Sequence, residues 1–328
     1  MAASLLPTLQ RDILATAQIA DAEALSTRNA WTDKQIGILS FNLGGVNVSF
    51  QPVQAGLRLL PAPAYRDFVF PGVGEVLLRV HAQAYRGQIS EAPRFETGNW
   101  ALYDAEDKVV LQRRFPGLKR KLDIHTVVLN PDGLSGDLYA GEGSADVSGA
   151  AAFEVPPYSF DEILTACFLA RRRGLLFHAC GISQEPRPGL MFAGVSGAGK
   201  STTAGIWQQV EGATLLSDER VAVRKQDGRY WLYGTPWHGA GQVSIPGVTP
   251  LGQVFILQHA SRNQARRLAP AEAVSLLLVR AYLPFWDAQG MAFTLEFLDE
   301  LCQSLPVYEL GFVPDASMVE FVRCLSVA

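Results

Sequence analysis

The sequence predicts an α/β domain with a mixed sheet and a phosphate-binding loop, preceded by a β-rich N-terminal domain. Three observations predict this fold class. Residues 35–150 contain short strand-like runs separated by turns, without a Gly-rich phosphate loop. Residues 191–203 place the pattern Gly-x-x-x-x-Gly-Lys-Ser between an apolar run and a run of helix formers. The apolar run at 175–182 is joined to that segment by a short turn, which predicts an antiparallel hairpin.

The composition is that of a globular chain. Its 328 residues suffice for one large domain or two ordinary ones, and 48% apolar against 18% charged residues is normal for such a protein. The net charge of −4 gives no reason to expect a nucleic-acid partner or an anionic membrane surface. No apolar run is long enough to span a bilayer, and the N-terminus lacks the order of a signal peptide. We therefore expect a cytoplasmic protein without membrane contact.

Four cysteines lie far apart in the sequence and form no C-x-x-C pair. They are expected to be small buried residues in a reducing compartment, and not disulfides or a zinc site: Cys167, Cys180, Cys302 and Cys324.

The sequence predicts that the chain is divided into three segments. Residues 1–34 form an N-terminal helical segment, because apolar residues over 4–26 recur at helical spacing. Residues 35–150 form a mostly antiparallel β domain of unknown role, and glycines between 141 and 149 predict its end. Residues 151–328 form the domain with the phosphate loop. The basic residues between 113 and 121 predict a solvated turn in preference to a surface for an acidic partner.

The expected elements follow from apolar periodicity and turn residues. In the first domain, strands are expected at 36–51 around a Gly44-Gly45 turn, and at 76–80, 100–103, 109–111, 122–129 and 138–139. In the second domain we expect a helix capped by Ser159, strands at 175–182 and 190–193, a helix at 200–210, a strand at 213–216, a hairpin over 220–233, a strand at 254–257, helices at 271–282 and 293–305, a strand at 307–312 and a helix at 316–325.

The phosphate loop carries the clearest chemical signal. Its residues are Gly194, Val195, Ser196, Gly197, Ala198, Gly199, Lys200, Ser201 and Thr202. The glycines let the backbone adopt positive φ, so that successive N–H groups can point at phosphate oxygens, and the helix that follows adds its N-terminal dipole. The Lys200 ammonium can reach the β- and γ-phosphates, and the Ser201 hydroxyl can ligate Mg²⁺. The alternative is an ordinary Gly-rich turn.

The acids Asp218 and Glu219 are the candidates for the metal and for activation of a nucleophile. Asp218 follows Lys200 by 18 positions, at the end of the next predicted strand. This spacing is shorter than in switch GTPases and motor ATPases and suits a kinase. Small-metabolite kinases place an acid there too, but they continue into a helix and a lid, whereas a β-hairpin is predicted here.

Three motifs together resemble a known family. His178-Ala179-Cys180-Gly181-Ile182, the loop from Gly194 to Ser201, and Asp218-Glu219-Arg220-Val221 resemble, in order and spacing, the catalytic domain of HPr kinase/phosphorylase. They also resemble the wider group of HPr-kinase-like proteins with a phosphoenolpyruvate-carboxykinase type of nucleotide fold. The resemblance spans residues 159–325, and residues 35–150 are similar in texture to the β-rich leader of HPr-kinase-like proteins.

The resemblance implies an ATP- and Mg²⁺-dependent kinase that acts on a serine hydroxyl of a protein or peptide. It implies that His178 belongs to the active site and that Asp218 holds the metal together with Ser201. It places Glu219, where the family usually has aspartate, near the acceptor hydroxyl. A core histidine and ordinary surface carboxylates are the structural alternatives for these three residues. Arg220 either steadies a phosphate or pairs with a carboxylate.

Further candidates are weaker. Residues 234–241, with Thr235 and His238, suit a segment that closes over substrate or a structural turn around Trp237. Arg262, Arg266 and Arg267 could supply charge to a phosphoryl group but are better explained as surface arginines. His81 and His125 are expected to be structural, and His259 has no evident partner.

One departure from the family limits the resemblance. The glycine-rich signature that follows the hairpin in true HPr kinase/phosphorylases is not recognisable, so HPr recognition and the reverse dephosphorylation are not carried over. The alternatives to a protein kinase are a nucleotide-binding regulatory or scaffold protein without phosphotransfer, and a small-molecule kinase. A homo-oligomer is compatible with the family.

Overall fold

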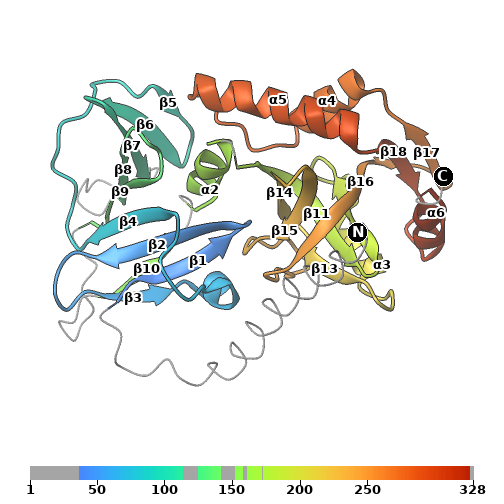
Figure 1. Ribbon diagram of the computed structural model, residues 1–328, viewed down its shortest axis with the longest axis horizontal. Helices are drawn as coiled ribbons and strands as arrows, with labels where there is room; N and C mark the ends of the chain where they lie inside the picture. Colours follow the sequence, from blue (N-terminus) through green and yellow to red (C-terminus); the bar gives the residue numbers. More distant parts are fainter. Residues whose placement is uncertain (1–36, 114–124, 142–151, 158–160, 172, 326–328) are drawn as a thin grey trace, which may run out of the picture. The chain divides into compact units, whose positions relative to one another are not determined.

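The computed structural model describes residues 37–113, 125–141, 152–157, 161–171 and 173–325. The described chain is a mixed α/β fold with large mixed sheets and few helices (Figure 1). The predicted N-terminal helical segment, Ser159 and nearly all of the basic turn after residue 113 lie outside the described residues. None of the described helices is both long and apolar enough to cross a lipid bilayer.

The first large sheet is built from residues 39–139. Its strands are β1 (Leu39–Leu43), β2 (Val46–Pro52), β4 (Val76–His81), β5 (Phe95–Glu96), β6 (Trp100–Ala105), β7 (Lys108–Arg113), β8 (Thr126–Leu129) and β9 (Ser135–Tyr139), in the spatial order β1-β2-β4-β9-β8-β7-β6-β5. The pairs β2–β4 and β4–β9 are parallel, and the other neighbours are antiparallel. The prediction of mostly antiparallel strands agrees with this sheet; its two parallel pairs were not predicted.

The turn between β1 and β2 has the expected glycines. Gly44 and Gly45 have φ of 61° and 82°, which is the combination that a two-residue hairpin turn with two left-handed positions requires. A short 3-10 helix η1 (Pro63–Phe68) and the strands β3 (Arg58–Pro61) and β10 (Ala152–Val155) were not predicted. β3 and β10 pair in parallel as a two-stranded sheet, so a segment placed after the predicted boundary is paired with one before it.

The second large sheet surrounds the phosphate-loop segment. Its strands are β11 (Leu175–Gln184), β12 (Arg187–Ala193), β13 (Thr214–Ser217), β14 (Arg220–Gln226), β15 (Arg229–Gly234), β16 (Val248–His259), β17 (Gln264–Arg267) and β18 (Val307–Phe312). Their order is β12-β11-β14-β15-β16-β18-β17, with β13 on β11 and an additional parallel pairing between β12 and β16. β16 is longer than predicted, and β17 was not predicted. The predicted antiparallel hairpin of β11 and β12 is confirmed.

β11 changes its partners halfway along its length. Residues 175–178 pair with β14, whereas the part from Ala179 onward pairs with β12 and β13. A strand of ten residues is long enough for the backbone groups of its two halves to hydrogen-bond to different neighbouring strands. The change of partners falls directly after His178.

The helices cover both faces of this sheet. They are α2 (Asp161–Ala170), α3 (Lys200–Trp207), α4 (Pro270–Leu278), α5 (Ala288–Ser304) and α6 (Ser317–Leu325). Side chains alternate along β11: Phe177 and Ala179 pack in a core with α4 and α5, while Cys180 and Ile182 pack with α3 and α6. Figure 1 shows α4 and α5 running along one side of the sheet strands.

α4 is shorter than predicted, because the chain after it runs beside β11. The backbone N–H of His178 donates to the Arg280 carbonyl at 2.8 Å, and that of Tyr282 donates to the Leu176 carbonyl at 2.9 Å. Residues 280–282 therefore cannot continue a helix, since their polar groups bond to a neighbouring strand.

A third buried core joins residues of both large sheets. It contains Phe41 and Tyr65 from the first part of the chain together with Leu176, Ala222 and Trp237 from the second. The core thus extends across the predicted boundary near residue 150, and the division into two domains stays a prediction.

Candidate functional site

Strand register brings three predicted motifs together. His178 pairs with Arg220 in β14, and the next residue, Ala179, pairs with Ala193 at the end of β12. The Ala179 N–H also donates to the Glu219 carbonyl at 3.0 Å. The change of partners in β11 therefore places His178 between the start of the phosphate loop and the Asp218-Glu219 pair.

The loop between β12 and α3 has the backbone that its sequence predicts. Gly197 and Gly199 have φ of 79° and 102°, and Gly199 is the N-cap residue of α3. A Cβ at Gly199 would lie 2.8 Å from the Phe312 ring, so both the backbone angle and the close approach require glycine. The side chains of Val195, Ser196 and Ser201 are exposed, as is that of Thr202.

Lys200 is a buried cation at the centre of this loop. Its side chain is 7% exposed, and its Nζ donates to the carbonyls of Gly194 at 3.0 Å and Val195 at 3.2 Å. Burial lowers the pKa of Lys200, and the nearby charges of Arg280 and Arg220 act in the same direction, against the Glu219 carboxylate. Within the described chain no carboxylate forms an ion pair with this ammonium.

His259 does have a partner, contrary to the sequence-based expectation. It is the last residue of β16, and its Nε2 lies 2.8 Å from the Gly197 carbonyl oxygen. An imidazole N–H in this place donates to the phosphate loop and helps to fix it. No local pattern of residues predicts this contact, because residues 197 and 259 are far apart in the chain.

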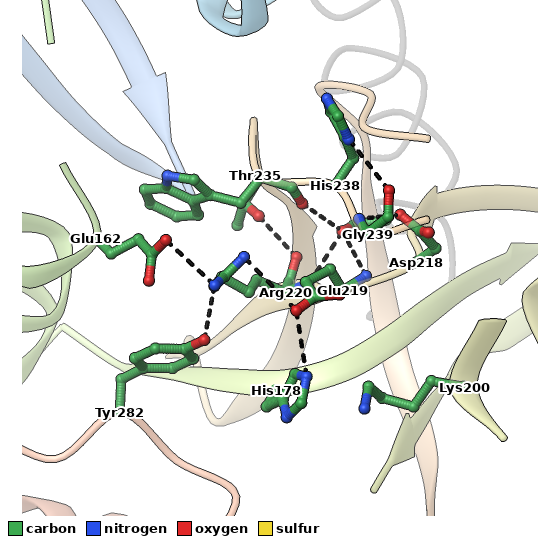
Figure 2. Close-up of polar contacts among 12 residues, drawn as sticks. Glu162, His178, Lys200, Asp218, Glu219, Arg220, Thr235, His238, Gly239 and Tyr282 are labelled. Atoms are coloured by element: carbon green, nitrogen blue, oxygen red, sulfur yellow. Dashed lines mark hydrogen bonds and ion pairs between the residues drawn. The ribbon is translucent and has the colours of Figure 1, made fainter. Parts of the chain in front are cut away.

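Asp218 is completely buried and holds a loop in place (Figure 2). Its Oδ1 accepts a hydrogen bond from the Gly239 amide at 2.8 Å, and its Oδ2 accepts one from the Gly241 amide at 2.7 Å. A Cβ at residue 239 or 241 would lie within 3.0 Å of the same Oδ2 atom, so both positions need glycine. The Gly-rich segment after β15 therefore wraps the Asp218 carboxylate.

The donor set around Asp218 fits a magnesium ion that binds with a nucleotide. Each carboxylate oxygen accepts one amide and keeps a second lone pair for a cation. Magnesium ions at nucleotide sites typically take one or two protein ligands and complete their shell with phosphates and water. No cluster of three or more His, Cys, Asp or Glu side chains that could hold a metal ion occurs among the residues that the structure describes.

Glu219 and His178 form a polar pair beside the lysine, as Figure 2 shows. The His178 Nε2 lies 3.3 Å from Glu219 Oε1, and the two side chains are 28% and 27% exposed. Burial lowers the pKa of His178, and the positive charge of Lys200 lowers it further, although Glu219 opposes both effects. The imidazole is therefore neutral at neutral pH and donates to a carboxylate that solvent can reach.

Arg220 is held by protein groups. Its Nε donates to the Tyr282 hydroxyl at 2.6 Å, and its guanidinium lies 3.2 Å from Glu162 and 3.8 Å from Glu219. Of the two roles considered for Arg220, pairing with a carboxylate is the one that the structure contains. Arg220 thereby links α2, the segment after α4 and the Glu219 side chain.

Arg280 is a site residue that sequence reasoning missed. It is 7% exposed, its Nη1 donates to the Leu276 carbonyl at 2.5 Å, and its buried Nε has no hydrogen-bond partner among the described residues. Within the described chain it pairs with no carboxylate, and burial lowers its pKa. No sequence pattern marks this arginine, because only the turn of the chain after α4 brings it beside β11.

Other predicted candidates lie elsewhere. Arg266 is bound on the surface by Glu272 and Glu309 at 2.8 and 3.0 Å, and Arg262 and Arg267 are exposed in or next to the same edge strand, β17. His238 is exposed, and its Nδ1 lies 3.2 Å from the carbonyl oxygen of the next residue, Gly239. The three arginines are not part of the cluster around Lys200, whereas His238 lies on the loop beside Gly239, whose amide bonds to Asp218 (Figure 2).

The geometry of the cluster is compatible with the binding of a phosphate-bearing ligand by backbone amides and a buried cation. No model of a known protein family matches this chain, and no curated protein matches it either.

Proposed function

We propose that this chain is an ATP- and Mg²⁺-dependent kinase that transfers the γ-phosphoryl group to a serine hydroxyl of a protein or peptide. The observation that supports this most is the Lys200 ammonium, which is buried within a glycine-rich loop and, among the residues that the structure describes, is bonded only to main-chain carbonyls. A buried cation without a counter-ion is costly, and a phosphate anion removes that cost. The loop amides and the N-terminus of α3 add hydrogen bonds for the same anion.

The charges around the loop suit a transferring phosphoryl group. Lys200 and the guanidinium of Arg280 are both buried cations, and the charge of Arg280 reaches Lys200 strongly enough to lower its pKa. Positive groups that are already in place stabilise the charge on the equatorial phosphate oxygens without reorganisation. Mg²⁺, when bound by Ser201 and Asp218, would neutralise further charge on the β- and γ-phosphates.

Glu219 is the best base for the acceptor. Asp218 is fully buried with both oxygens bonded to amides, whereas Glu219 is partly exposed and is held by His178. In the proposed step the serine hydroxyl gives its proton to Glu219, the new O–P bond forms, and the bond from the γ-phosphorus to the β–γ bridging oxygen breaks to release ADP. Neutral His178 orients the carboxylate through its Nε2–H.

Replacement of Lys200 tests nucleotide binding. We expect Lys200→Ala to weaken ATP binding in the presence of Mg²⁺ by about a hundredfold, because truncation of a buried charged partner costs about 2–5 kcal/mol. Lys225→Ala is the matched control, since Lys225 is an exposed lysine that pairs with Glu300 at 2.8 Å. Calorimetry on both variants makes the comparison, and equal ATP affinity in the two would remove Lys200 from the site.

A second set of variants tests phosphoryl transfer. Glu219→Gln keeps an oxygen that can accept from His178 but cannot take a proton, so turnover should fall by about 10²- to 10⁴-fold while ATP binding persists. Asp218→Asn tests the metal role less specifically. Its NH₂ group would face one of the two loop amides, donor against donor, so the variant would also disturb the loop. Transfer from labelled ATP to proteins of a cell extract measures turnover. Label found only in inorganic phosphate would contradict the kinase proposal.

A further inference from the structure

The loop that wraps Asp218 is anchored in a core built mainly by the first sheet. Trp237 is 7% exposed and belongs to the buried cluster that contains Phe41 and Tyr65. Its indole meets the Tyr65 ring edge-on, with ring centroids 6.4 Å apart, and Tyr65 in turn packs edge-on against Phe41 at 5.8 Å. Tyr65 lies in η1 and Phe41 in β1, so the indole is held by residues distant from the phosphate loop.

Hydrogen bonds between main-chain atoms at and after Trp237 and the side chains of Ser217 and Asp218 connect the same segment to the site. The Ser217 hydroxyl donates to the Trp237 carbonyl at 2.9 Å, directly before Asp218 in the chain. Gly239 and Gly241 follow Trp237 by two and four residues, and their amides donate to the Asp218 carboxylate. We call residues 235–241 the Trp237 loop.

We propose that Trp237 is a positioning residue, which ties the Trp237 loop to the first sheet and so holds the two glycine amides on Asp218. The proposal rests on the proposed function in one respect, the role of Asp218 as a magnesium ligand. This proposal gives the first sheet a role: its core holds Trp237 and thereby supports the loop at the proposed metal site. Trp237 acts through the loop and contacts no reacting group.

The physical reason is the flexibility of the loop itself. Glycines at 239, 241 and 234 give this segment little intrinsic preference for one backbone conformation. A large buried aromatic ring supplies the packing energy that a glycine-rich segment lacks. Donors that orient a ligating carboxylate are commonly worth about ten- to a hundredfold in metal affinity, so a loosened loop should weaken metal binding.

Hydrogen exchange tests the anchoring without any assumption about function. In Trp237→Ala and in Tyr65→Ala we expect the amides of Gly239 and Gly241 to exchange at least about tenfold faster, in the range of couplings carried through packed side chains. Trp237→Phe keeps a ring and should restore most of the protection. Leu111→Ala, in the same core but away from the loop, is the control for general destabilisation.

Metal dependence tests the consequence. The Mg²⁺ concentration for half-maximal phosphoryl transfer should rise about tenfold in Trp237→Ala and in Tyr65→Ala, with Trp237→Phe close to the parent. ATP binding without Mg²⁺, which depends on the phosphate loop, should not change. A loss of stability alone would not change the Mg²⁺ concentration for half-maximal transfer.

The outcomes separate the two proposals. Fast exchange at residues 239 and 241 in a parent chain that binds no ATP would contradict the anchoring and the proposed function together. Faster exchange in the variants with an unchanged Mg²⁺ requirement supports the anchor and removes the metal role of Asp218.

Unchanged protection of the two amides in folded Tyr65→Ala and Trp237→Ala, or equal loss of protection in Leu111→Ala, overturns the positioning role. If Trp237→Ala does not fold, Tyr65→Ala and Trp237→Phe decide.

Discussion

Buried ionisable groups set the chemistry of the candidate site at the scale of single residues. Lys200 and Arg280 are both held away from water without a carboxylate partner among the described residues, and burial lowers the pKa of each. Burial also lowers the pKa of His178, which leaves Glu219 paired with a neutral donor. The site therefore holds two buried cations that an anionic ligand would neutralise.

A buried histidine outside the site predicts how stability depends on pH. Burial lowers the pKa of His125 to about 4, the charge of Arg113 adds to this, and Nδ1 of the ring has no hydrogen-bond partner in the described part of the chain. The unfolded chain takes up a proton below about pH 6.5, whereas the folded chain does so only near pH 4. The free energy of unfolding should therefore fall between these values on acidification, by up to about 3 kcal/mol.

Urea unfolding between pH 7 and pH 4 measures this dependence. His125→Gln has no imidazole to protonate, and its unfolding free energy should fall less steeply over the same range. The ring of His125 packs edge-on against Phe153 at 5.3 Å, so the variant is expected to lose some stability at every pH. Identical slopes in the parent and the variant would contradict the assignment to His125.

At the scale of elements, the phosphate loop depends on its neighbours as well as on its own glycines. β18 ends at Phe312, whose ring lies against Gly199, and β16 ends at His259, which bonds to Gly197. β11 contributes His178 where it changes partners. β16 and β18, both distant in sequence from the loop, thus contact the segment that leads into α3.

Two glycines of the loop should respond differently to alanine. Gly199→Ala strains a φ of 102° and also meets the Phe312 ring, so we expect a loss of about 2–4 kcal/mol of stability. Gly197→Ala has a similar φ of 79° but open space around the added methyl group, and should lose about 1 kcal/mol.

Thermal and chemical unfolding of both variants provide the comparison. Phe312→Leu in the Gly199→Ala background should recover part of the loss, since a smaller side chain gives the methyl group room. Equal losses for the two glycine variants, with no recovery, would show that the Phe312 contact does not matter.

At the scale of the whole molecule, the first sheet and the phosphate-loop sheet share a core. The turn at Gly44-Gly45 reaches the second sheet, where the Arg224 guanidinium donates to the Gly45 carbonyl and also to the Arg173 carbonyl at 3.1 Å. A Cβ at Gly44 would lie 2.5 Å from the Ala222 Cβ. The two sheets should therefore unfold together.

Gly44→Ala tests this contact between the sheets. We expect it to lose about 2–4 kcal/mol, because it adds a steric clash to the strain of a positive φ. Gly56→Ala has a φ of 86° in open space and should lose only the strain, about 1 kcal/mol. One unfolding transition seen by probes in both sheets is expected, and two separate transitions would contradict the shared core.

The sequence predicted well wherever the signal is local. The hairpin of β11 and β12, the turn at Gly44-Gly45 and the helix after Gly199 follow from turn residues and apolar periodicity, which act between neighbours in the chain. The length of α4 was predicted less well, because the backbone of Arg280 and Tyr282 is paired by β11 and no local pattern reports that pairing.

By itself, the sequence determined the mixed α/β class, the glycine-rich loop around Lys200 and the closeness of Asp218 and Glu219 in the chain. Only the tertiary structure decided that Asp218 bonds the Trp237 loop, that Arg280 is buried near Lys200 and that Trp237 lies in a core with Tyr65. These contacts join residues separated by long stretches of chain. Their energy comes from burial and from hydrogen bonds that exist only once the sheets have assembled, so no local pattern of residue types encodes them.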